Sequence, residues 1–190
     1  MTAPTFDPAG SELTIETKAV GMLAKLAHDL SIAANDITVS TAAEGDDIVV
    51  TLRAPVGRLE VRGVRKGTSV DEAGLSKSDK TEIQRKIREE VLKANEVVAK
   101  LSVRAASLSL SEPGKRAIPA KGTVAVGSRS ANVSTEASVE VTTEGVRASG
   151  RVRLDLPALG ITPPKGPLGA FKVHETVEIV FRLAFASAPA

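Results

Sequence analysis

Alternation of apolar and polar residues at every second position is the feature that most constrains the fold of this chain. Successive side chains of a strand point to opposite faces, so this period predicts strands that each bury one face. The pattern recurs in the segments 12–16, 48–53, 59–62, 101–104, 107–111, 123–141 and 146–156. It is strongest near the C-terminus, where one face would consist of Val177, Ile179, Phe181, Leu183 and Phe185.

Turn residues separate these segments. Residues 44–47, 112–115 and 143–145 combine glycine with acidic residues or proline, as expected for tight reversals between antiparallel neighbours. Roughly eight strands joined mostly by hairpins would curl or split if they formed one open sheet. The residues therefore predict an all-β, mainly antiparallel protein, built either as a sandwich or as a closed up-and-down barrel.

One segment breaks the strand pattern. Residues 79–94 carry apolar side chains at helical spacing, namely Ile83, Ile87, Val91 and Ala94, with charged residues between them. Ser78 or Asp79 would cap the first turn of this amphipathic helix. Because such a helix gains most of its stability by docking, we expect it to cover the β structure as a lid.

Composition limits the class of protein. The chain of 190 residues shows no break in composition, which predicts one domain over 1–190 with its core at about 7–186. A net charge of +2, four Phe and no Trp or Tyr argue against a nucleic-acid partner. No apolar run is long enough to span a membrane and no export signal is visible, so we expect a cytoplasmic protein.

His28 and Asp29 form the most conspicuous polar pair. Neighbours on a strand point to opposite faces, so the pair does not imply cooperation, and three roles stay open for it: a structural hydrogen bond, a place at a ligand mouth, or catalysis and metal binding. His174 is the only other histidine. A metal-dependent enzyme would need both imidazoles together with Asp29 or Glu175, although their spacing matches no common zinc motif.

Several segments resemble the YceI-like family of bacterial lipid- or polyisoprenoid-binding proteins. They are residues 21–29, 85–94 with the following strand at 101–103, and the loop and closing strand at 159–164 and 169–181. The resemblance implies an extended eight-stranded, lipocalin-like β-barrel whose apolar interior holds an isoprenoid or fatty-acyl chain. It also implies a binding protein without enzymatic activity, and a periplasmic location as the alternative to the cytoplasm.

The interior of such a barrel would be rich in Val, Ala, Gly and Leu, which leaves room for one slender ligand. We expect the cavity to be lined by Leu13, Ile15, Leu30, Ile32, Leu101, Val103, Val152, Leu154, Ile179 and Phe181. Leu23, Leu26, Ile161 and Phe171 would form its mouth, and His28 is a further candidate contact to the ligand. The same small residues also fit a packed, ligand-free interaction module. No cofactor is expected besides the apolar ligand, and a homodimer is left open.

The proline-rich segment 157–168 runs between two strong strands and should form a stiff, extended loop. We expect this loop and Phe171 to gate the barrel, because a long ligand should enter through an end of it. The alternative is that Phe171 packs beneath the helix.

Overall fold

The computed structural model describes residues 4–21, 27–108, 112–166 and 169–187. Within these residues one antiparallel sheet has the strand order β4-β5-β8-β9-β10-β11-β13-β1-β3-β6-β7. Its strands are β1 (Thr5–Glu16), β3 (Leu30–Ala34), β4 (Thr38–Glu44), β5 (Asp47–Pro55), β6 (Leu59–Lys66), β7 (Ser69–Asp71), β8 (Glu96–Arg104), β9 (Gly114–Val126), β10 (Arg129–Val141), β11 (Gly145–Asp155) and β13 (Thr176–Ala186).

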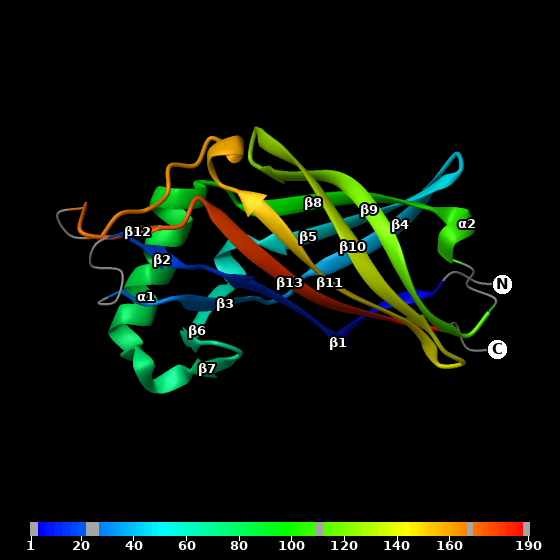
Figure 1. Ribbon diagram of the computed structural model, residues 1–190, viewed down its shortest axis with the longest axis horizontal. Coiled ribbons are helices and arrows are strands. Elements are labelled where there is room, and N and C mark those ends of the chain that lie inside the picture. The colour runs from blue at the N-terminus through cyan, green and yellow to red at the C-terminus, as the bar shows by residue number, and fades with distance from the viewer. Residues whose placement is uncertain (1–3, 22–26, 109–111, 167–168, 188–190) are drawn as a thin grey trace.

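The remaining elements are short. Strands β2 (Ala19–Val20) and β12 (Lys172–Val173) form a separate two-stranded ribbon. The helical elements are η2 (Val56–Arg58), η3 (Glu72–Gly74), α1 (Lys77–Lys86), η4 (Ile87–Leu92), α2 (Ala105–Leu108) and η5 (Pro157–Leu159). In Figure 1 the helix α1, β2 and β12 gather at one end of the molecule, while both termini and α2 lie at the opposite end.

The prediction of a mainly antiparallel β protein with one inserted amphipathic helix is confirmed, but that of a closed eight-stranded barrel is wrong. The sheet contains eleven strands among the described residues, and no pairing joins its edge strands β4 and β7. The sheet is nevertheless curled: its edge strand β4 contacts β1, which is not its neighbour in the strand order. Residues 8–11 interrupt the register of β1 with β13, and Pro8 among them has no N–H to donate to a ladder.

Two further segments differ from the prediction. Strand β4 was not predicted, because its residues are mostly exposed Ser, Thr and Ala without an apolar alternation. The expected strand at 107–111 is wrong where it can be compared, since Leu108 ends the short helix α2. Residues 109–111 lie outside the described residues.

The helix begins and ends earlier than predicted. Ser76, rather than Ser78 or Asp79, caps α1: its Oγ accepts a hydrogen bond from the Asp79 amide at 3.1 Å and donates one to the Asp79 carboxylate at 2.7 Å. The cap thus lies two residues before Ser78 and three before Asp79, and its hydroxyl both accepts from and donates to Asp79. After Lys86 the hydrogen-bonding widens into the π-helical turn η4, which ends at Lys93 in a left-handed conformation.

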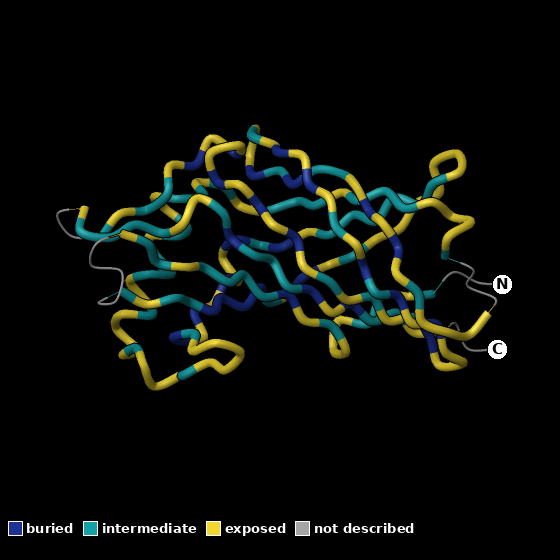
Figure 2. The backbone as a smooth tube through the Cα atoms, in the orientation of Figure 1, coloured by how far each residue is buried: buried dark blue, intermediate teal, exposed yellow. Residues whose placement is uncertain are grey.

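Buried and exposed residues alternate along the long strands, as Figure 2 shows for β9 and β10. The buried side chains form one apolar cluster, and apolar residues of the helical segment, Ile83, Ile87 and Val91, pack against it. In the part of the chain that the structure describes, no helix is long and apolar enough to cross a membrane. The buried residues in the described ranges are thus apolar except for Ser31.

Candidate ligand-binding cavity

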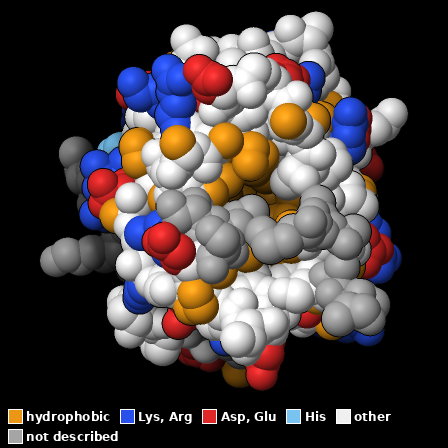
Figure 3. Space-filling model, turned by 90° about the vertical axis from the view of Figure 1, so that its right-hand side faces the viewer, with side chains coloured by type: hydrophobic (Ala, Val, Ile, Leu, Met, Phe, Trp, Pro, Cys, Tyr) orange, Lys and Arg blue, Asp and Glu red, His pale blue; other side chains and the backbone are white. Residues whose placement is uncertain are grey.

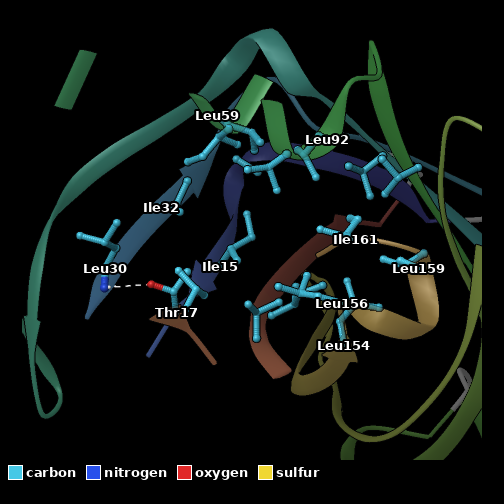
Figure 4. A pocket seen from close by; sticks show the side chains of 18 of the residues that line it. Ile15, Thr17, Leu30, Ile32, Leu59, Leu92, Leu154, Leu156, Leu159 and Ile161 are labelled. Carbon is cyan, nitrogen blue, oxygen red and sulfur yellow. Dashed lines mark hydrogen bonds between the residues drawn. The ribbon is translucent and has the colours of Figure 1, made fainter. Parts of the chain in front are cut away.

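An apolar cavity of about 790 Å³ lies between the curled sheet and the helical segment α1–η4. In Figure 4, Leu30 and Ile32 of β3 and Leu59 of β6 stand on one side of an open space, and Leu154, Leu156 and Ile161 stand on the other. Pockets that bind small molecules commonly have volumes of about 300–1,000 Å³. The cavity is therefore large enough for a small-molecule ligand. A completely packed core, the alternative considered from the sequence, would contain no such space.

The cavity is kept open by small residues on the strands behind it. Ala34, Ala54 and Ala99 line it, each where a larger side chain would extend inward. Gly150 lies opposite Phe181 in the register of β11 and β13, and a Cβ at Gly150 would lie only 2.7 Å from the Phe181 ring. The tip of the Phe181 ring therefore occupies the place that a side chain at residue 150 would need.

The helical lid is fixed to the sheet by hydrogen bonds near its middle and at its C-terminal end. The side-chain oxygen of Gln84 accepts from the Val61 amide at 3.0 Å, which ties α1 to β6. Arg129 of β10 donates to the Leu92 carbonyl at 2.5 Å and so satisfies a free carbonyl at the end of η4. Ile83, Ile87, Val91 and Leu92 contribute the lid's side of the cavity lining.

Most of the residues predicted to contact a ligand do line this cavity. They are Leu13, Ile15, His28, Leu30, Ile32, Leu101, Val152, Leu154, Ile161, Phe171, Ile179 and Phe181. Val103 does not: it pairs with Ile48 nearer the opposite end and packs partly buried against the core. Leu23 and Leu26 lie outside the described residues. Whether any of these residues binds a ligand stays a prediction.

Sequence reasoning missed part of the lining. Val50 and Leu52 of β5 were predicted to lie on a strand, but nothing in their period showed which interior region they face. Leu156 and Leu159 come from the start of the proline-rich loop, where η5 turns both side chains inward. The signal for η5 was the Leu-Pro sequence at 156–157, since proline favours the first turn of a helix.

Residues 161–166 and 169–173 pair with each other near the end of the molecule that carries α1. The Gly166 amide donates to the Phe171 carbonyl at 2.9 Å, and the Val173 amide donates to the Pro164 carbonyl at 2.9 Å. A methyl group at Gly166 would overlap the half-buried Phe171 ring, so the ring lies against the loop's own backbone. Phe171 also lines the cavity.

The hydrogen bonds of Asp29 and His174 are made with backbone groups. The Asp29 carboxylate accepts from the Ala19 amide at 2.8 Å, while Nδ1 of His174 accepts from the Thr176 amide at 2.9 Å. Of the described residues, no group of three or more His, Asp or Glu side chains could hold a metal ion. Asp29 thus has a structural hydrogen bond, and the exposed His28 lines the cavity.

The end of the molecule that carries both termini is also hollowed. Figure 3 views this end, and apolar side chains gather there around a depression that charged residues surround. Phe6 and Phe185 are cross-strand partners on β1 and β13, with ring centroids 5.9 Å apart in an edge-on arrangement. Aromatic pairs prefer such an edge-to-face arrangement over a face-to-face stack.

Together, these features define an antiparallel β protein that encloses an apolar cavity under a helical lid. No model of a known protein family matches the sequence, and no curated protein matches it. Among solved structures, the chain is similar to BcnA of Burkholderia cenocepacia, with a TM-score of 0.62 and 10% identity over 94% of this chain and 98% of that one. It is also similar to a polyisoprenoid binding domain from Saccharophagus degradans, with a TM-score of 0.63 and 9% identity over 99% of this chain and 100% of that one.

At these identities the similarity concerns the fold. It extends over nearly the whole chain in both comparisons, so the helix and the curled sheet are matched together. The similarity to a polyisoprenoid binding domain agrees, at the level of the fold, with the resemblance noted in the sequence.

Proposed function

We propose that this protein is a non-enzymatic binding or carrier protein for a long-chain apolar small molecule, which it holds in the cavity beneath α1 and η4. The observation that carries the proposal is the cavity of about 790 Å³ with its almost entirely apolar lining. Burial of a hydrocarbon chain there would contribute about 0.8 kcal/mol per methylene. The cost of immobilising the ligand offsets part of that gain.

The volume suggests the size of the ligand. A volume of about 790 Å³ lies within the range of about 300–1,000 Å³ that is common for small-molecule pockets, which is the size class of an isoprenoid or fatty-acyl chain. The polyisoprenoid binding domain of similar fold supports an isoprenoid as one such ligand.

Solvent extraction of the purified protein tests this function. We expect the extract to yield one class of long-chain apolar molecule in about equimolar amount when it is analysed by mass spectrometry. Delipidated protein should then take up added isoprenols or fatty acids. A protein that is free of lipid as purified and takes up neither class would contradict the proposal.

The loop and Phe171 are proposed as the gate through which the ligand enters. We expect Phe171→Ala to speed ligand release by several-fold while costing no more than about 1 kcal/mol of stability, because the ring is only half-buried and lies over Gly166. Stopped-flow displacement of a fluorescent fatty acid measures the rate. Unchanged release together with a loss of about 3 to 5 kcal/mol would instead identify Phe171 as a core residue.

A further inference from the structure

The charged residues of the cavity are all of one sign. Lys86, Lys165 and Lys172 line it, whereas no Asp or Glu of the described chain does. We call these three residues the mouth lysines: they line the cavity and remain at least partly exposed to solvent. The lining is otherwise apolar apart from Thr17 and His28, so positive charge adjoins the apolar surface of the cavity.

Two of the mouth lysines are held directly opposite each other. Lys165 and Lys172 are partners in an antiparallel β-bridge, which places their side chains on the same face of the folded-back loop. The hydrogen bonds from Gly166 to Phe171 and from Val173 to Pro164 flank this bridge and fix it. Like charges at directly opposed positions destabilise a β pair. An anion between the two lysines would remove this repulsion.

The acidic residues nearby compensate these lysines only in part. Lys172 Nζ lies 2.8 Å from Glu175, and a hydrogen bond from Lys172 lowers the pKa of that carboxyl. Lys86 Nζ is 3.7 Å from Glu82. Glu82 is mainly engaged elsewhere, since a hydrogen bond from Arg85 at 2.9 Å lowers its pKa.

Lys165 differs from the other two. Within the described ranges its side chain forms no ion pair, although it lines the cavity and faces Lys172 across the bridge. A cation without a counter-charge next to an apolar cavity suits a ligand with an apolar chain and an anionic end.

We infer that the cavity takes an amphiphile whose anionic head group, a carboxylate or a phosphate, lies between Lys165 and Lys172 while its chain fills the interior. This inference rests on the proposed function and adds the chemistry of the ligand's polar end. The head group accepts charge-assisted hydrogen bonds from both ammonium groups. A neutral alcohol of the same chain leaves the repulsion between the two lysines in place.

The test compares pairs of ligands that differ only in the head group: hexadecanoate with hexadecanol, and farnesyl phosphate with farnesol. Titration of delipidated protein below the micellar concentration should give the anion at least about tenfold tighter binding than the alcohol. Lys165→Met and Lys172→Met should each weaken binding of the anion about tenfold and change that of the alcohol less than about twofold. The pair with the larger difference distinguishes a carboxylate from a phosphate.

Two matched variants control for charge and folding. Lys165→Arg keeps the cation and should retain the preference for the anion. Lys121→Met removes a lysine from β9. Lys121 is exposed and follows the buried Ala120, so its removal should change the affinity for neither the anion nor the alcohol. Thermal melting of each variant confirms that it is folded.

Equal affinity for the acid and the alcohol in the wild-type protein would overturn the inference and leave the proposed function standing. An equal loss of affinity for the acid and the alcohol in a folded Lys165→Met variant would overturn it as well. The lysine would then act through packing of its aliphatic stem. If none of the four ligands binds, the proposed function itself fails.

Discussion

Ala99→Phe should abolish ligand binding and leave the protein stable. Ala99 lies on β8 between its cross-strand partners Leu52 and Val124, and all three residues line the cavity. A phenyl ring there would occupy the space of about six methylenes, each worth about 0.8 kcal/mol to the bound chain. We expect affinity for a fatty acid or isoprenol to fall at least about a hundredfold, measured by displacement of a fluorescent lipid.

The stability of the same variant separates an open cavity from a filled core. In a cavity the new ring buries its own apolar surface, so the melting temperature should stay unchanged or rise. In a filled core, overpacking would cost about 1–3 kcal/mol. Ala125→Phe is the matched control, because Ala125 lies on β9 between the cavity-lining Val124 and Val126, on the other face of the strand. A destabilised Ala99→Phe that still binds lipid would contradict the cavity.

Ile118→Ala should cause one of the largest losses of stability that a single substitution can produce in this protein. Ile118 is only 1% exposed, lies on β9 opposite Ala137, and belongs to the apolar cluster without lining the cavity. Its surroundings are packed, so truncation would leave a void and cost about 2–5 kcal/mol. Urea unfolding monitored by circular dichroism measures this change in the free energy of unfolding.

Ile179→Ala provides the comparison. Ile179 pairs with Ile15 and Val152, lines the cavity and is half-buried, so its side chain already borders empty space. Its removal from ligand-free protein should cost less than about half as much as that of Ile118. Bound lipid should widen the effect of Ile179→Ala and leave that of Ile118→Ala unchanged. Equal losses at both positions in ligand-free protein would show that the interior is packed uniformly.

Much of the strand structure was predictable from the period of the sequence. The alternation from Val177 to Phe185 recurs as the buried and half-buried face of β13, and that from Val146 to Leu154 recurs in β11. These strands have apolar rows because each buries one face against the interior. The helix was predictable for the same reason: Ile83, Ile87 and Val91 repeat at the spacing of one helical face.

Other features left no readable period. Strand β4 is mostly exposed and polar, so it has no apolar row to reveal it, and its place at the sheet edge follows from pairing with β5 alone. Ser78 or Asp79 was predicted as the cap, whereas Ser76 is the cap in the structure. Ser and Asp are both good N-cap residues, so residue type alone does not select one of these three positions.

The sequence by itself determined the class of the protein, because side-chain period and turn residues are local properties: antiparallel strands, one amphipathic helix and an apolar interior. Only the tertiary structure decided where that interior is empty. Ile32, Leu101 and Val103 share the same strand pattern, yet the first two line the cavity and Val103 does not. Their position along the curled sheet decides this, and so do the residues that face them. That arrangement depends on the interrupted register of β1, on the docked lid and on contacts between strands far apart in the chain, none of which a local period contains.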